Sequence, residues 1–270
     1  MKAMKQRSMS VRSRSCSIPI SALAGVGLLS APPALAASLI PVNLELQLLI
    51  DVSGSISRDE YNLMLKGYRS AFINLAPRFG AGGFGDVAVN TVVWSSKEQQ
   101  QIAIPWFLIN NTANAIEFAN TIGSMNRGFD NTTAPGTAIN FAVPLFANNQ
   151  FEGKRWVINV SGDNKQNEGD STPQARDRAL AMGVTAINGL PLLNDDTNLL
   201  NWYQNNLVGG QNSFAIAAND FTEFGTAIEA KLAREMQPSE PVPEPTTIFG
   251  TLAFGAVASW WRIKRKSIGN

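Results

Sequence analysis

The chain has 270 residues, 44% of them hydrophobic, which is enough to bury the core of one full domain and to leave tails at both ends. Its 22 basic and 21 acidic residues nearly balance, but nine of the basic residues lie before Ala36 or after Trp261. The part between these tails has 13 basic and 21 acidic residues. An acidic body of this kind argues against nucleic acid as a partner and is compatible with cation binding.

Two residue types are too scarce to support several kinds of chemistry. The chain has no histidine, which excludes a histidine general base, a Ser-His-Asp triad and imidazole metal ligands. Its single cysteine, Cys16, precedes any plausible mature start, so a mature chain would have no disulfide and no zinc–thiolate site. Any metal ion must therefore be held by oxygen atoms.

The first 36 residues have the three parts of a secretory signal peptide. A basic region up to Arg14 is followed by an apolar stretch at 18–29, and Ala34-Leu35-Ala36 provides the small residues of a cleavage site. The alternative is an N-terminal membrane anchor, but the apolar run is short for a span and is interrupted by Ser21. We therefore expect residues 1–36 to be a signal peptide and the chain to be exported.

The C-terminal region also has three parts in order. A linker at 238–245 contains Val242-Pro243-Glu244-Pro245, residues 246–261 are mostly apolar, and a basic tail completes the segment 246–270. The apolar part would reach only ~24 Å as a helix, against a hydrocarbon core of ~30 Å, so it would be a marginal permanent anchor. The basic tail would stay in the cytoplasm.

This order resembles the PEP-CTERM sorting signal of Gram-negative bacteria. The resemblance implies that an exosortase-type enzyme processes the chain near the Pro-Glu-Pro sequence. Residues 246–261 would then anchor the chain in the inner membrane only transiently, and its destination would be the cell surface or the extracellular space. The alternative is an ordinary tail that spans the membrane once.

Apolar runs alternate with amphipathic stretches between the tails, which predicts one α/β domain at 37–237 with helices on both faces of a sheet. In chain order we expect a strand at 43–51, a helix at 57–76, two strands at 86–95 and 99–109 that form a hairpin, and helices at 112–123 and 137–147. A core strand at 155–160, a helix at 173–182, a strand at 184–188, a partly helical stretch at 193–207, a strand at 213–217 and a helix at 221–236 follow. Residues 80–85 match G-x-G-x-x-G, but they follow a helix and precede a strand, so we interpret them as a flexible loop rather than a dinucleotide site.

Three polar motifs lie at the carboxyl ends of predicted strands or at the start of the next helix, where ligands of open α/β sheets collect. The first is Asp51-Val52-Ser53-Gly54-Ser55, the second contains Thr137, and the third ends in Asp163. Taken alone, each motif has a simpler explanation. The first could be an ordinary turn, Thr137 could be a helix N-cap, and Asp163 could be a loop carboxylate. Their position after three separate strands favours a shared metal site, with Thr132 or Thr133 as possible substitutes for Thr137.

These motifs resemble the metal-ion-dependent adhesion site of von Willebrand factor A domains. The resemblance covers about residues 43–236 and implies a Rossmann-like fold with a mostly parallel central sheet. It also implies that Ser53, Ser55 and Thr137 contact the metal directly, while Asp51 and Asp163 act mainly through bound water. Residues 157–164 are similar to an uncharacterised bacterial subfamily, in which Asn159 and Asn164 of this chain are replaced by Asp and Gly.

The small, hydroxyl-rich site favours Mg²⁺, with Mn²⁺ or Ca²⁺ as alternatives. We therefore expect a binding or adhesion module, not an enzyme, that engages a carboxylate of an extracellular protein or polysaccharide. One alternative is a structural matrix protein in which the metal only stabilises the fold. Another is a phosphotransfer enzyme with Asp51 as nucleophile, but such sites usually need an acidic residue where this chain has Ser53.

Overall fold

The computed structural model describes residues 38–194 and 196–238, and all of its helices and strands belong to the compact unit that begins at Leu39. The predicted signal peptide at 1–36, the Pro-Glu-Pro sequence and the apolar segment at 246–261 lie outside the described residues. Within them, no helix is both long enough and apolar enough to cross a membrane.

A six-stranded sheet forms the centre of the fold, in the order β4-β3-β2-β6-β7-β8. The four central strands β3, β2, β6 and β7 are parallel, whereas β4 and β8 pair antiparallel at the two edges. The bounds of the strands are β2 (Leu44–Asp51), β3 (Val87–Trp94), β4 (Gln100–Ile109), β6 (Trp156–Gly162), β7 (Ala186–Pro191) and β8 (Gly209–Gly210). The expected mostly parallel sheet and the β3–β4 hairpin are confirmed.

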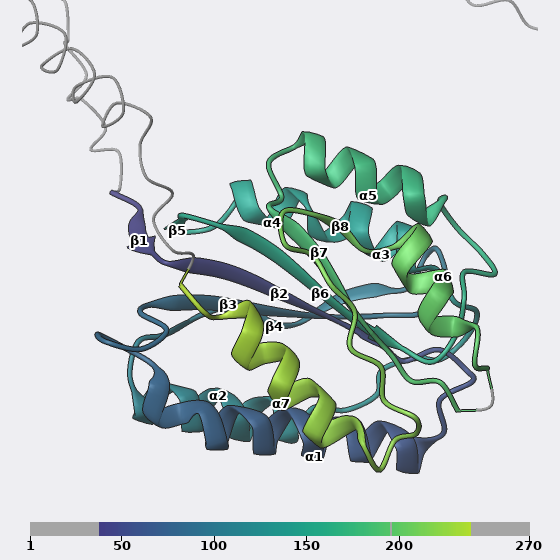
Figure 1. Cartoon of the computed structure of the whole chain (residues 1–270), viewed down its shortest axis with the longest axis horizontal. Helices are drawn as coiled ribbons and strands as arrows, with labels where there is room; N and C mark the ends of the chain where they lie inside the picture. The colour runs from purple at the N-terminus through teal and green to yellow at the C-terminus, as the bar shows by residue number, and fades with distance from the viewer. Residues whose placement is uncertain (1–37, 195, 239–270) are drawn as a thin grey trace, which may run out of the picture. The chain divides into compact units, whose positions relative to one another are not determined.

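Helices cover both faces of this sheet, as expected (Figure 1). One face packs against α1 (Arg58–Leu75), α2 (Thr112–Gly123) and α7 (Phe224–Glu235). The other packs against α3 (Pro135–Ala142), α4 (Pro144–Ala147), α5 (Thr172–Ala181) and α6 (Leu199–Asn206). A short 3-10 turn, η1 (Ala76–Arg78), follows α1.

Two local features explain why elements of this fold could be predicted from the amino-acid sequence. Every residue of β2 is buried, because helices cover the strand on both sides, and this produces the continuous apolar run at its end. Helix α1 begins where expected because Ser57 and Glu60 form a reciprocal capping box. Both features are encoded by neighbouring residues, and the sequence predicted the strand and the start of the helix.

Three predictions about elements need correction. Three short strands were not predicted: β1 (Ile40–Val42) and β5 (Phe151–Gly153), which pair in a small separate sheet, and β8 at the edge of the main sheet. The helix expected at 137–147 is two helices, because Pro144 has no amide hydrogen to continue α3.

The strand expected at 213–217 is wrong. This segment follows the edge of β7 beyond β8 but meets it only in isolated parallel bridges, Gly189 to Ala215 and, just past the segment, Leu192 to Ala218, so no continuous strand forms. The glycine-rich residues 80–85 lie between η1 and β3. Two backbone hydrogen bonds join Gly80 and Gly85, so these residues form a closed turn. That position confirms that it is not the phosphate-binding turn of a dinucleotide site.

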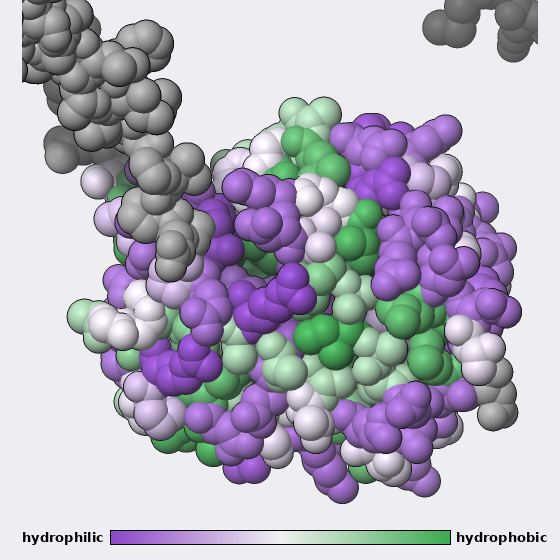
Figure 2. All heavy atoms as spheres, in the orientation of Figure 1, coloured by the Kyte–Doolittle hydropathy of each residue, from purple (hydrophilic) through white to green (hydrophobic). Residues whose placement is uncertain are grey.

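Hydrophilic residues cover most of the face seen in Figure 2, and hydrophobic residues gather near its middle. In the described part of the chain six large hydrophobic residues are exposed, and apart from the adjacent Leu39 and Ile40 they are spread along the sequence: Leu39, Ile40, Leu63, Ile102, Ile116 and Met182. Recognition through polar sites therefore suits this surface better than recognition through a broad apolar patch.

Candidate metal site

Two of the predicted motifs meet at the carboxyl edge of the sheet, on the right in Figure 1. Strand β2 ends at Asp51, and its parallel neighbour β6 ends at Gly162. The register pairs Ile50 with Ser161, so Asp51 and Asp163 leave the sheet side by side. The topology thus brings together residues that are more than a hundred positions apart in the sequence.

Hydrogen bonds connect four of the five predicted metal ligands. The carboxylate of Asp51 accepts a hydrogen bond from the backbone amide of Ser53 through Oδ1 at 2.7 Å. The hydroxyls of Ser53 and Ser55 are 3.2 Å apart, and the Ser55 hydroxyl donates to Oδ1 of Asp163 at 2.6 Å. Two carboxylates and two hydroxyls therefore form one contiguous oxygen cluster.

Thr137, the fifth predicted ligand, is not hydrogen-bonded to the other four. It lies in the first turn of α3, and its hydroxyl accepts a hydrogen bond from the backbone amide of Asp170 at 2.9 Å. The N-cap of α3 is Ala134, so the reading of Thr137 as an N-cap is wrong. The neighbouring substitute Thr132 donates its hydroxyl to Glu168.

The loop before α3 nevertheless lies directly against the Asp51 loop. The backbone amide of Gly54 donates to the carbonyl of Asn131 at 2.6 Å. The hydroxyl of Ser95, which follows β3, donates to the carbonyl of Thr132 at 3.0 Å. These contacts place the start of α3 at the same edge of the sheet as the oxygen cluster.

Asp51 is buried in a way that suits a cation. Its side chain is fully buried, and its Oδ2 atom has no hydrogen-bond partner among the described residues. Burial, with the negative charge of Asp163 as a second cause, raises the pKa of Asp51 to about 8, although hydrogen bonds from Ser53 and the charge of Arg127 oppose the shift. Burial also raises the pKa of Asp163. An orphaned carboxylate oxygen beside a second carboxylate is an arrangement that a divalent cation would stabilise.

The composition of the cluster limits which kind of metal site it can form. In the part of the chain that the structure describes, no group of three or more histidine, cysteine, aspartate or glutamate side chains could hold a metal ion. A cation held here would therefore depend on two carboxylates and on neutral hydroxyls. This donor set fits a hard ion such as Mg²⁺ and does not fit a site built for zinc from thiolates and imidazoles.

The absence of a side chain at Gly162 leaves space for the Asp51 carboxylate. A Cβ atom at position 162 would lie 2.6 Å from Oδ2 of Asp51 and 3.0 Å from the hydroxyl of Tyr203, a buried residue of α6. Only glycine therefore allows both side chains to approach the end of β6.

Sequence reasoning missed two residues that shape the site. The guanidinium of Arg127 donates to the carbonyls of Val52, Ser53 and Ile56 at 2.6 to 3.2 Å, so it fixes the backbone of the Asp51 loop. The hydroxyl of Tyr203 and the Asp51 carboxylate both lie against Gly162. Neither residue belongs to a local motif, since each lies about 70 or more positions from Asp51 in the sequence.

Comparison with solved structures shows the fold of the chain. Two crystal forms of proximal thread matrix protein 1 from the mussel byssus match it with TM-scores of 0.54 and 0.52, at 19% and 20% identity. The matches cover 74% and 72% of this chain and 49% and 47% of the byssus chains, so this chain spans about half the length of those proteins. A von Willebrand factor type A structure from Catenulispora acidiphila matches with a TM-score of 0.49 at 15% identity, over 72% of this chain and 42% of that one. No curated protein matches the chain.

The fold is the Rossmann-like α/β fold of von Willebrand factor A domains, with a mostly parallel sheet between two layers of helices. The chain belongs to the family described as "Protein of unknown function (DUF1194)", whose model matches residues 41–240.

Proposed function

We propose that this chain is a divalent-cation-dependent binding module. Asp51, Ser53, Ser55 and Asp163, together with Thr137, would hold Mg²⁺, and a carboxylate of an extracellular protein or polysaccharide would complete the coordination. The observation that carries this proposal is the fully buried Asp51, whose Oδ2 atom has no partner beside the Ser53–Ser55–Asp163 cluster. Mn²⁺ and Ca²⁺ are the alternative ions.

The donor set explains why such a site would bind a partner. Hydroxyl groups carry no negative charge, so a cation held partly by Ser53 and Ser55 would keep much of its positive charge. The ion would then attract an anionic ligand at an open coordination position. Arg127 would hold the Asp51 loop in place when the anionic ligand binds, because its hydrogen bonds go to backbone carbonyls of that loop rather than to the ion.

The proposal extends to export and processing. Residues 1–36 would be removed as a signal peptide, residues 37–237 would form the binding domain, and 238–270 would be the linker and sorting signal for an exosortase-type enzyme. The module would then act at the cell surface or outside the cell. An enzymatic role with Asp51 as a phosphoryl acceptor fits less well, because Ser53 stands where such a site needs a second acidic residue.

A capture experiment tests the binding role. We expect the immobilised full-length chain to retain more of an acidic, uronate-rich polysaccharide in Mg²⁺ than in EDTA, because the ion would bridge the two. The variant Asp51→Asn should lose this Mg²⁺-dependent part of the retention, by about tenfold or completely. The neutral polysaccharide dextran is the ligand control, and Asp59→Asn, an exposed acidic residue in the first turn of α1, is the protein control.

Two outcomes would count against the binding role. Retention that is the same in Mg²⁺ and EDTA would show that the cation is not involved. In the second outcome, Mg²⁺ raises the unfolding temperature of the chain, yet the chain retains no acidic polysaccharide or surface protein. That result would support the alternative function, a structural matrix protein in which the metal only stabilises the fold.

A further inference from the structure

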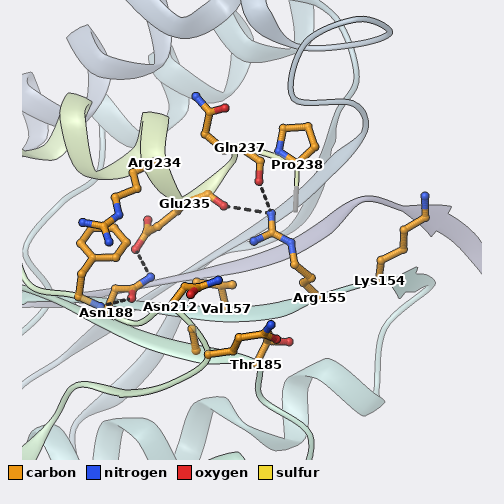
Figure 3. A pocket seen from close by; sticks show the side chains of 13 residues that line it. Lys154, Arg155, Val157, Thr185, Asn188, Asn212, Arg234, Glu235, Gln237 and Pro238 are labelled. Atoms are coloured by element: carbon orange, nitrogen blue, oxygen red, sulfur yellow. Dashed lines mark hydrogen bonds between the residues drawn. The ribbon is translucent and has the colours of Figure 1, made fainter. Parts of the chain in front are cut away.

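A cavity of about 710 Å³ lies at the end of the domain opposite the candidate metal site (Figure 3). It is formed by the residues at the starts of β6 and β7 and by the end of α7. A cavity of this volume lies within the range of small-molecule sites in proteins. The oxygen cluster and this cavity are separated by the length of β6, roughly 23 Å at 3.3 Å per residue.

Three cationic side chains line the cavity, although the domain as a whole is acidic. They are Lys154, Arg155 and Arg234. None of the three forms an ion pair with a carboxylate that the structure describes, whereas other cations do, for example Lys165 with Asp196 at 2.7 Å. The cavity therefore collects positive charge that the protein does not neutralise.

The one carboxylate in the lining, that of Glu235, is already fully bonded. Its Oε1 atom accepts from Lys231 at 2.6 Å and from Asn188 at 3.0 Å, and its Oε2 atom accepts from Asn159 at 2.8 Å. Lys231 and Asn159 are fully buried, and Lys231 pairs with the Glu235 carboxylate. Glu235 acts electrostatically on Arg155 but forms no ion pair with it, so one carboxylate faces three cations of the lining.

Arg155 is the cation best placed to bind a ligand. It is half-buried, and its Nη2 atom donates to the carbonyls of Glu235 at 3.1 Å and Gln237 at 2.9 Å, beyond the end of α7. Within the described residues its Nε and Nη1 atoms have no hydrogen-bond partner. Burial lowers the pKa of Arg155, although the charge of Glu235 opposes the shift, so the guanidinium is partly desolvated and an anion bound to it would stabilise its charge. A guanidinium with free donors on one edge matches the two oxygens of a carboxylate or phosphate.

The turn after β8 adds polar groups to the same cavity. Gly210 and Asn212 both have a positive φ, of 97° and 56°, and Asn212 adopts this conformation although it is not a glycine. The backbone amide of Gln211 donates to the carbonyl of Thr185 at 2.9 Å, which fixes the turn to the start of β7. Figure 3 shows the side chain of Asn212 among the lining residues, below Arg234 and Glu235. Asparagine tolerates this left-handed conformation in turns, so the turn can present a side-chain amide to the cavity.

From these contacts we propose that the cavity is a second binding site, independent of the cation, for a small organic oxyanion such as an acidic monosaccharide unit. Arg155 binds the carboxylate or phosphate group, Lys154 and Arg234 contribute charge, and Asn212 hydrogen-bonds to neighbouring hydroxyls. Arg234 is held for this role over the ring of Phe214, at 3.7 Å from its centroid. The domain would then contact anionic material at both ends of its sheet.

Calorimetric titration of the full-length chain in EDTA tests this site without the metal. The probes are galacturonate, glucose 6-phosphate and glucose. We expect saturable binding of at least one of the two acids and none of glucose, and the stronger acid identifies the preferred oxyanion. Arg155→Gln should weaken that binding about tenfold, and Lys154→Gln and Arg234→Gln should each weaken it severalfold, because each loses a charged contact.

Matched variants separate this site from the candidate metal site and from general charge effects. Lys66→Gln, which removes an exposed cation of α1, and Asp51→Asn should bind the acid as the wild type does. Arg155→Gln also removes a contact to the end of α7, so Lys154→Gln and Arg234→Gln decide the result if that variant is poorly folded. No saturable binding of either acid, or binding that all three cavity variants leave unchanged, would overturn the proposal.

Discussion

Replacing Lys231 with methionine should lower the free energy of unfolding by about 3–5 kcal/mol, because it leaves a buried carboxylate without its cation. Both side chains of the Lys231–Glu235 pair are fully buried between α7 and the sheet. Burial lowers the pKa of Lys231 to about 8 although Glu235 raises it, so Lys231 is still mostly protonated at neutral pH. Urea denaturation of the full-length chain at pH 7 measures the effect.

Two variants control for this prediction. Lys66→Met makes the same change at an exposed position of α1 and should alter the stability by less than about 0.5 kcal/mol. The double variant Lys231→Met, Glu235→Gln should recover part of the loss, because it removes the uncompensated charge while the amide can still bond to Asn159 or Asn188. The account of α7 would be wrong if Lys231→Met were no more destabilising than Lys66→Met.

Mg²⁺ binding should tighten about tenfold per pH unit as the pH rises from about 6 to 8, and then level off. The reason is that burial and Asp163 raise the pKa of Asp51 to about 8, so below that pH the ion must displace a proton from the carboxylate. Titrations of the full-length chain with Mg²⁺ at pH 6, 7, 8 and 9 measure this dependence. Because Asp163 is also shifted upward, the apparent pKa belongs to the pair of carboxylates.

The same shift has a consequence for the metal-free chain. The folded pKa of Asp51 lies above the unfolded value, so the native state binds an extra proton between about pH 4 and pH 8. The contribution of Asp51 to stability is therefore present below pH 4 and is lost as the pH rises through this window, by up to about 1.4 kcal/mol per pH unit. Asp51→Asn, measured in EDTA, should lack this part of the slope. Equal slopes in the wild type and the variant, together with pH-independent Mg²⁺ binding, would contradict the assignment.

The fold was largely predictable because most of its strands and helices are encoded by patterns of neighbouring residues. The central strands β2, β3, β6 and β7 are apolar runs that match their burial on both faces, and the helices have amphipathic periodicity. The errors lie at the edges of the sheet. Residues 213–217 have the composition of a strand, but they meet the edge of β7 beyond β8 only in an isolated bridge, and a sequence pattern does not record how regularly an edge segment pairs.

The candidate site was predictable for the same reason, and only in part. Asp51, Ser53 and Ser55 lie in one turn, and the rule that ligands collect at the carboxyl ends of parallel strands brought Asp163 to them. Arg127 was not predictable, because it acts through long-range bonds to backbone carbonyls that no motif encodes. The unbonded position of Thr137 relative to the other four residues was not predictable either, since it depends on how the loop before α3 packs.

Calorimetric titration of Mg²⁺ into the full-length chain at pH 8 tests the central claim most directly, with Asp51→Ala and Thr137→Ala measured beside the wild type. We expect one binding event in the wild type, a loss of affinity of about 100-fold or more in Asp51→Ala, and a loss of about tenfold or more in Thr137→Ala. The second variant decides whether Thr137 joins the oxygen cluster when the ion is bound. No binding of Mg²⁺ by the wild type at this pH, or full affinity in Asp51→Ala, would contradict the account.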